Sequence, residues 1–371
     1  MSLVQRTMRT AVPAAFVVIV CACTPAAAVP SEVSASIPAT ASLTTQPSVA
    51  TPSAPPSPTP IAVLDGEPWV LSGWYLPGKQ TKDLFLTRPD GTDSHAVLTD
   101  LPGERVAPAW APDGQRFAFV TRDASTPYGS IWTADADGSG AAMLTDGGGD
   151  CPGGIFHPTW SPDGSRLAVV CYPDIDPGGG SIATFDPATG TVDRLYTVTW
   201  PEHLDGPPSW SPDGKSLAFA ILHWDPTDQF LDGSLVAVVP AAGGPADRLT
   251  AFETNMSGPT WSPDGNELAM YSYDLGNMHT TDQASNVFAI RPDGTGLRQI
   301  TRSAVDGHMR ITTPRWSPDG AQLMVTVGVA PPSAGPLATV NDLRLGVVDA
   351  AGGEPVLWPP TIHGGVVRPT P

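Results

Sequence analysis

Basic residues are scarce in this chain of 371 residues, which has 19 Lys and Arg against 37 Asp and Glu. The formal net charge is −18 with His neutral. Binding to DNA or RNA through phosphates needs a basic surface, and docking onto anionic lipid by charge alone needs one too. We therefore expect no nucleic-acid partner and no membrane contact that depends on charge.

The N-terminus lacks an apolar run that spans a bilayer comfortably, because the stretch AVPAAFVVIVCA (11–22) is too short. Two arginines precede it and small residues follow it, which is typical of a secretory signal. The run ends in VCAC, which resembles a bacterial lipobox, although Val and Cys stand where Leu and Ala or Ser are usual. The resemblance implies a signal peptide over 1–22 and a lipid on Cys23. The alternative is an ordinary signal peptide cut at 26–28.

Charged side chains are nearly absent from residues 23–60, where Pro, Ala, Ser, Thr and Val dominate and Glu32 is the one charged residue. Such a segment cannot build a core and stays an extended tether. We expect the folded domain to cover 61–371, exported and lipid-anchored to the bacterial cell membrane or envelope.

Cysteine is also rare, and Cys151 and Cys171 are the only two beyond residue 60. In an exported protein we expect them to form a disulfide. A nucleophilic cysteine would need a basic neighbour, which the sequence does not identify.

Familiar catalytic motifs are missing. The sequence has no G-x-S-x-G elbow, no H-E-x-x-H, no P-loop and no G-x-G-x-x-G after a strand. The sequence therefore favours a protein without catalytic activity, and it predicts no cofactor.

What the chain does contain is a repeat, P-x-W-[SA]-P-D-G, present five times. Its tryptophans are Trp110, Trp160, Trp210, Trp261 and Trp316. A period of about 50 residues with strand-like content is typical of a propeller. The S-P-D-G segment fits a tight turn, and the 38 Gly and 43 Pro favour an all-β fold.

The number of blades follows from a second hairpin in each period. Six such hairpins centre on Gly91, Gly138, Gly190, Gly243, Gly294 and Gly352. The missing sixth inner strand is predicted at Val366–Pro369, which aligns with the segment before Trp110 and would pair with the blade that begins near Trp69. We therefore predict an all-β, six-bladed propeller of four-stranded antiparallel blades, closed by the C-terminal strand; seven blades is the alternative.

These repeats resemble those of the TolB-type six-bladed propellers over residues 61–371. The resemblance implies the same fold. TolB itself has a small α/β domain before its propeller, whereas this sequence has the Pro-rich tether, so TolB's own partners are not carried over.

A tryptophan that recurs in every blade is expected to pack between blades, so function should lie where the copies differ. The long, dissimilar segments are the second-to-third-strand loops and the links between blades, which share one face of a propeller. We call it the looped face, and loops on a rigid scaffold are where recognition normally resides. Its candidate binding residues are Tyr128, Phe156, Tyr172, Trp200, His203, His223, Trp224, Tyr273, His279 and His308.

Exposed aromatic side chains suit a sugar ring or a peptide, and the alternative is that they plug the channel or pack under their own loops. The preferred function is therefore a monomeric binding or scaffolding module that recognises an envelope protein or glycan. A periplasmic sensor that reports its ligand to a partner is a third interpretation.

A metal-assisted hydrolase or lyase is the other alternative. It would need loop histidines and carboxylates to converge, namely His203, His223, His279, His308, Asp205, Asp225, Asp282 and Asp306. No fixed short ligand spacing supports this, and isolated surface histidines are the simpler interpretation. A divalent cation such as calcium, held by loop Asp and Asn residues, stays an open alternative.

Overall fold

A computed structural model of the chain describes ten segments. They are residues 70–75, 82–88, 94–123, 126–173, 179–227, 231–272, 285–302, 309–329, 342–357 and 365–367. All of them lie in one compact unit, Pro55–Pro371. The predicted signal peptide, the lipidation at Cys23 and the tether fall on residues outside those described. None of the described segments forms a helix with the length and apolar character needed to cross a bilayer.

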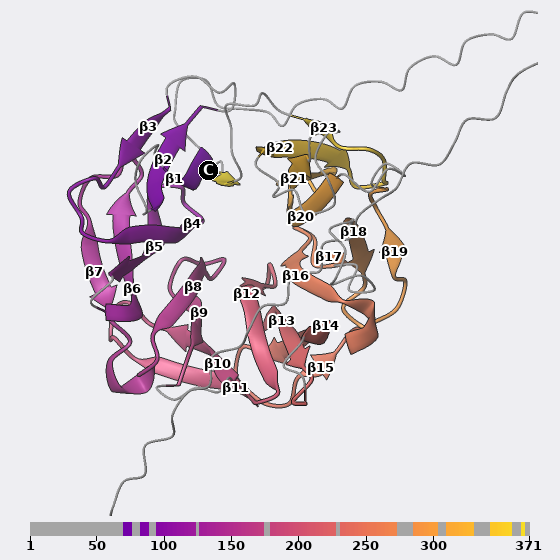
Figure 1. Ribbon diagram of the computed structural model, residues 1–371, viewed down its shortest axis with the longest axis horizontal. Coiled ribbons are helices and arrows are strands. Elements are labelled where there is room, and N and C mark those ends of the chain that lie inside the picture. Colours follow the sequence, from indigo (N-terminus) through magenta and orange to yellow (C-terminus); the bar gives the residue numbers. More distant parts are fainter. Residues whose placement is uncertain are drawn as a thin grey trace, which may run out of the picture. The chain divides into compact units, whose positions relative to one another are not determined.

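The described strands form six four-stranded antiparallel sheets arranged as a ring (Figure 1). Blade 1 holds β24 (Gly365–Val367), β1 (Val70–Tyr75), β2 (Lys82–Thr87) and β3 (His95–Val97). Blade 2 holds β4 (Glu104–Trp110), β5 (Arg116–Asp123), β6 (Thr126–Asp135) and β7 (Ala142–Thr145). Blade 3 holds β8 (Ile155–Trp160), β9 (Leu167–Cys171), β10 (Gly179–Phe185) and β11 (Val192–Thr199).

The second half of the ring repeats this plan. Blade 4 holds β12 (Glu202–Trp210), β13 (Ser216–Trp224), β14 (Leu231–Pro240) and β15 (Asp247–Arg248). Blade 5 holds β16 (Met256–Trp261), β17 (Leu268–Ser272), β18 (Asn286–Ile290) and β19 (Arg298–Gln299). Blade 6 holds β20 (Met309–Trp316), β21 (Gln322–Val329), β22 (Asp342–Asp349) and β23 (Val356–Leu357). Two short 3-10 helices, η1 (Gly148–Asp150) and η2 (Phe252–Thr254), lie in links between blades.

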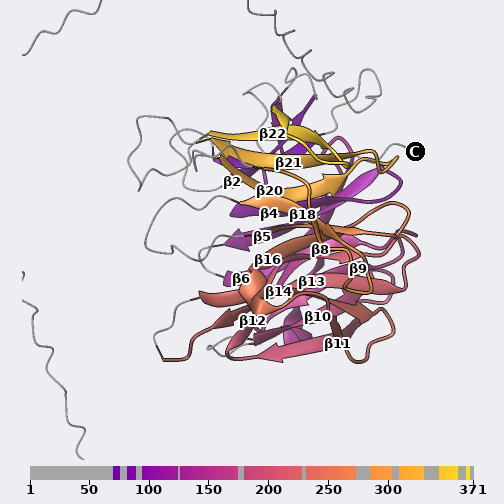
Figure 2. The ribbon, with the colours of Figure 1, turned by 90° about the vertical axis from the view of Figure 1, so that its right-hand side faces the viewer.

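The ring closes as the sequence predicted. Strand β24 pairs antiparallel with β1, with Leu71 opposite Val366 and Val70 opposite Val367. The last described strand, β24, accordingly lies beside β1 in Figure 1, and Figure 2 shows β20, β21 and β22 side by side in the last blade. Pairing the two ends of the chain in one sheet covers an edge that would otherwise be open. The prediction of six blades, rather than seven, is confirmed.

The hydrophobic core lies between neighbouring blades. One cluster joins Val120 and Ile131 of blade 2 to Ile155 and Val169 of blade 3, all fully buried. The central strand β9 is buried along its whole length because apolar residues face a neighbour on both sides. Each blade therefore fixes the next, and the loops are carried on a rigid frame.

The repeated tryptophans connect adjacent blades, as expected of frame residues. The indole Nε1 of Trp210 donates to the carbonyl of Thr159 in the preceding blade, at 3.1 Å. Trp316 makes the same bond to the carbonyl of Thr260, also at 3.1 Å. The guanidinium of Arg116 in blade 2 lies 4.5 Å from the ring centroid of Trp160 in blade 3.

The Asp of each S-P-D-G turn stabilises its own turn. In blade 3, Asp163 Oδ1 accepts from the hydroxyl of Ser161 at 2.6 Å and from the backbone N–H of Ser165 at 3.0 Å. These hydrogen bonds, that from Ser161 foremost, lower the pKa of Asp163 to about 2. The acidic residues of the repeat thus serve the turns rather than a catalytic site.

Candidate functional site

The rings of Trp200 and Trp224 both contact the ring of His203 on the looped face. The His203 ring is perpendicular to that of Trp200, with centroids 5.6 Å apart, and is steeply tilted to that of Trp224 at 6.1 Å. Trp200 lies in the link before β12, His203 near the start of β12 and Trp224 at the end of β13. The backbone N–H of Trp224 donates to the carbonyl of Pro201 at 3.0 Å, which holds the strand end against the link. We call Trp200, His203 and Trp224, all half-buried, the blade 4 aromatic cluster.

The pleat of the sheet separates His223 from this cluster. Residues opposite each other in an antiparallel pair share a face, and neighbours along a strand alternate between faces. His223 is opposite Glu202, so it lies on the other face of blade 4 from His203. There its Nδ1 lies 3.3 Å from the Asp232 carboxylate, and its ring centroid lies 5.1 Å from that of Phe252.

Arg248 lies on the same face of blade 4 as His223. Its Nη2 lies 2.7 Å from Glu202 Oε1, and its guanidinium lies 5.3 Å from the Phe252 ring centroid. The carboxylate of Glu202 is therefore neutralised by a nearby cation. This face of blade 4 is a charge-paired surface, and His223 belongs to it.

A second group, carried by the innermost strands β8, β12 and β16 and by the end of β9, joins blades 3, 4 and 5. We call Phe156, His157, Tyr172, Asp205 and Ser257 the axis cluster. The rings of Phe156 and Tyr172 meet edge to face at 5.6 Å, and the Ser257 hydroxyl donates to the Asp205 carboxylate. Burial, reinforced by Asp205, raises the pKa of Tyr172 to about 12. Burial lowers the pKa of His157, against an opposing effect of Asp205. Both rings are thus neutral near pH 7.

A bulge in the innermost strand presents His157. The register of β8 against β9 shifts between Phe156 and Thr159, and His157 between them has a φ of 55°. Similar shifts occur in the innermost strands of blades 2, 4, 5 and 6. Residues just before the repeat proline with a positive φ include Ala107, Gly258 and Thr313. The bulge is therefore a feature that blade 3 shares with other blades, whereas the imidazole of His157 distinguishes blade 3.

The chemistry of the axis cluster is that of a polar binding surface. Ser257 donates to the Asp205 carboxylate, and no imidazole partner of this hydroxyl occurs in the described part of the chain, so a Ser–His pair is not formed there. Within the described segments, no three His, Cys, Asp or Glu residues gather as they would to hold a metal ion. His203 and His223, two of the four histidines that a metal site on the looped face would need, lie on opposite faces of one blade.

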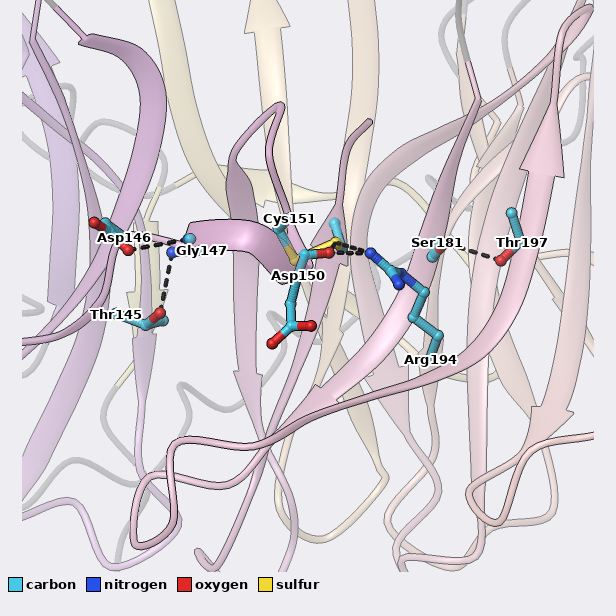
Figure 3. Close-up of a disulfide and its surroundings, with 10 residues drawn as sticks. Thr145, Asp146, Gly147, Asp150, Cys151, Ser181, Arg194 and Thr197 are labelled. Atoms are coloured by element: carbon cyan, nitrogen blue, oxygen red, sulfur yellow. Dashed lines mark hydrogen bonds between the residues drawn. A yellow bond between two sulfur atoms is a disulfide. The ribbon is translucent and has the colours of Figure 1, made fainter. Parts of the chain in front are cut away.

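A disulfide between Cys151 and Cys171 ties the link that enters blade 3 to the end of β9 (Figure 3). Both cysteines are buried. The guanidinium of Arg194 donates to the carbonyl of Asp150 beside them, and the Cys151 N–H donates to the Gly147 carbonyl at 2.8 Å. This part of the looped face is thus cross-linked covalently.

The predicted binding residues are distributed unevenly. The structure brings together Trp200, His203 and Trp224, and separately Phe156 with Tyr172. Tyr128 lies in β6, but its side chain is outside the described part. Tyr273, His279 and His308, with Asp282 and Asp306, also lie outside the described residues.

Sequence reasoning missed His157, Ser257, Phe252 and Arg248. His157, Ser257 and Arg248 lie in strands, whereas function was expected in the loops. The contact of Ser257 with Asp205 joins residues 52 positions apart in neighbouring blades, a contact that a single sequence does not reveal. Phe252 lies in one of the dissimilar links between blades, so its aromatic ring is a signal that the sequence offers.

Comparison with known proteins finds relatives that match only part of this chain. An uncharacterized protein of Agrobacterium fabrum is 33% identical over 118 residues, which is 32% of this chain and 34% of that protein. The uncharacterized peptidase YuxL of Bacillus subtilis is 28% identical over 148 residues, 33% of this chain and 22% of its own length. The chain thus spans about a third or less of these two relatives.

Solved structures agree on the fold. A protein of Agrobacterium tumefaciens that was assigned as TolB superposes with a TM-score of 0.52 and 23% identity, covering 72% of this chain and 84% of that one. The Tol-Pal system protein TolB of Nitratidesulfovibrio vulgaris is 36% identical over 55 residues, 15% of this chain and 12% of that protein. The family model of the TolB beta propeller domain matches residues 118–326, more than half of the chain. With the six blades and their repeated turns, this match shows that the chain belongs to the TolB beta propeller family.

Proposed function

We propose that this protein is a non-catalytic binding module that recognises a glycan or an extended peptide of the cell envelope through the looped face of blade 4. The observation that carries the proposal is the blade 4 aromatic cluster. Its two indoles flank an imidazole, and all three rings are half-buried on a rigid frame. Aromatic faces held in place in this way stack on sugar rings or anchor a peptide side chain with little loss of conformational entropy.

The axis cluster supports the same function with polar groups. A neutral Tyr172 and a neutral His157 supply hydrogen-bond donors, and Asp205 supplies an acceptor. Recognition sites commonly combine aromatic walls with a few such polar groups. The metal-assisted hydrolase or lyase has no ligand group among the described residues to support it, and we do not propose it.

The test is a binding screen of the full chain on a glycan array and an envelope-derived peptide library. Trp200→Ala and Trp224→Ala should each weaken a hit by roughly tenfold or more, as expected for aromatic anchors. Met143→Ala is the control, because Met143 is 54% exposed on β7 of blade 2, outside the cluster. Hits that survive both tryptophan substitutions would contradict the proposed site.

We also propose that the protein is exported and anchored by a lipid on Cys23, acting as a monomer that is held off the membrane by residues 23–60. This rests on the lipobox resemblance and the tether composition. Labelled palmitate should be incorporated into the wild-type chain expressed in a bacterium and not into Cys23→Ala. Equal labelling of both would refute the anchor.

A further inference from the structure

Arg315 breaks the repeat at the position just before the tryptophan. In the other copies this residue is small: Ala109, Thr159, Ser209 and Thr260. The small residues serve the seam between blades, where the Thr159 hydroxyl donates to the Pro208 carbonyl of the next blade at 2.9 Å. The frame is therefore built without a guanidinium at this position in four blades, and Arg315 calls for another explanation.

The guanidinium of Arg315 has no hydrogen-bond acceptor or carboxylate partner among the residues that the structure describes. Its side chain is half-buried on β20, the innermost strand of blade 6, opposite Met324. Burial lowers the pKa of Arg315, and Tyr271 of blade 5 acts in the opposite direction. An acceptor that reaches the N–H donors of this partly desolvated guanidinium lowers its free energy.

A shortage of carboxylates does not explain this isolation, because the chain has 37 acidic residues. Other basic side chains of the described part do find carboxylates. These pairs are Arg105–Asp83, Arg122–Glu104, Arg166–Asp193, Lys215–Asp213, Arg248–Glu202 and Arg298–Glu267. Arg315 differs from them in having no carboxylate partner among the residues that the structure describes.

We propose that Arg315 anchors a binding site for a carboxylate-bearing ligand on the axis side of blade 6. The planar fork of a guanidinium matches the two oxygens of a carboxylate. One positive charge balances one carboxylate, whereas a phosphate dianion would bring excess negative charge into a protein of net charge −18. The site does not depend on the blade 4 aromatic cluster, so either proposal can fail alone.

The test is an NMR titration of the full chain, labelled with ¹⁵N, in which acetate replaces chloride at constant ionic strength. The reporters are the Arg315 Nε–H, identified by its loss in Arg315→Gln, and the indole Nε1–H of the adjacent Trp316. We expect both signals to move saturably with acetate. N-acetylglycine and glucuronate, titrated in parallel, distinguish a peptide carboxyl terminus from an acidic sugar.

In Arg315→Gln, the acetate response of the Trp316 indole should weaken by roughly tenfold or more. Arg291→Gln is the matched control, since Arg291 is exposed in a hairpin turn of blade 5, and it should titrate like the wild type. Should Arg315→Gln fail to fold, Arg315→Lys keeps the charge but loses the fork and should still weaken the response. A wild-type response that is absent or does not saturate, one that Arg315→Gln retains, or one given by phosphate but not acetate would overturn the proposal.

Discussion

At the scale of single residues, the blades share a backbone plan and differ in the side chain placed at an equivalent position. The bulge of the innermost strand carries Ala107 in blade 2 and His157 in blade 3, and both have a positive φ. The residue before the tryptophan is Thr260 in blade 5 and Arg315 in blade 6. Because the backbone is constant, each change of side chain alters local chemistry without altering the fold.

The turn of blade 3 gives a prediction at this scale. Ser161→Ala removes the main hydrogen bond that lowers the pKa of Asp163, so that pKa should rise from about 2 toward 3.8. A carboxyl whose pKa is lowered by folding stabilises the protein above its unfolded pKa, and this contribution is lost as the pH falls through the folded pKa. Ser161→Ala should therefore be less stable than the wild type at pH 6, and the difference should shrink between about pH 4 and pH 2.

Carbon-13 NMR of the Asp163 carboxyl across the acid range, with urea unfolding at pH 6 and pH 2, measures both quantities. An unchanged pKa in Ser161→Ala would show that the Ser165 interactions alone hold the turn.

At the scale of elements, neighbouring blades are joined by a strand-to-strand contact of the repeated tryptophan. Trp210→Phe removes the bond to the Thr159 carbonyl, at a cost of about 1 kcal/mol beyond the change in ring size. Trp160→Phe is the comparison, because the Trp160 Nε1 is buried without a partner among the described residues. Urea unfolding of both variants should show the larger loss for Trp210→Phe, and equal losses would mean that the bond adds no net stability.

The disulfide gives a second prediction at this scale. It joins residues 20 positions apart, so Cys151→Ser with Cys171→Ser should lower the free energy of unfolding by about 3 kcal/mol in the loop-entropy model. Thermal melts of the wild type with and without a reductant, beside the double variant, provide the measurement. If reductant lowers the melting temperature of the double variant as much as that of the wild type, the effect does not come from this bond.

At the scale of the whole molecule, stability depends on joining the two ends of the described chain. Deletion of residues 363–371 removes β24 and leaves β1 unpaired on the edge that β24 covered. We expect a melting temperature lower by roughly 5 °C or more, and self-association through the exposed edge. Calorimetry and size-exclusion chromatography measure the two effects, and a truncated chain that melts and elutes like the full one would contradict this account of closure.

The sequence by itself determined the frame, because the frame repeats. Five copies of one turn, each beginning at a tryptophan such as Trp160, independently indicate the same local geometry. The strand order within a blade and the number of blades could therefore be predicted from the sequence. The closing strand at Val366 followed from the alignment of the C-terminal residues with the segment before Trp110.

The tertiary structure decided which candidate residues meet. Side chains alternate across a pleated strand, so His203 joined two indoles while His223, close to one of them in sequence, faced the other way. The pairing of Asp205 with Ser257 depends on a neighbouring blade that the chain reaches about 50 residues later, and so does the lack of a carboxylate partner for Arg315 among the described residues. Contacts between blades depend on strand register and on packing. Identical turns in each repeat do not reveal which side chains the register and the packing bring together.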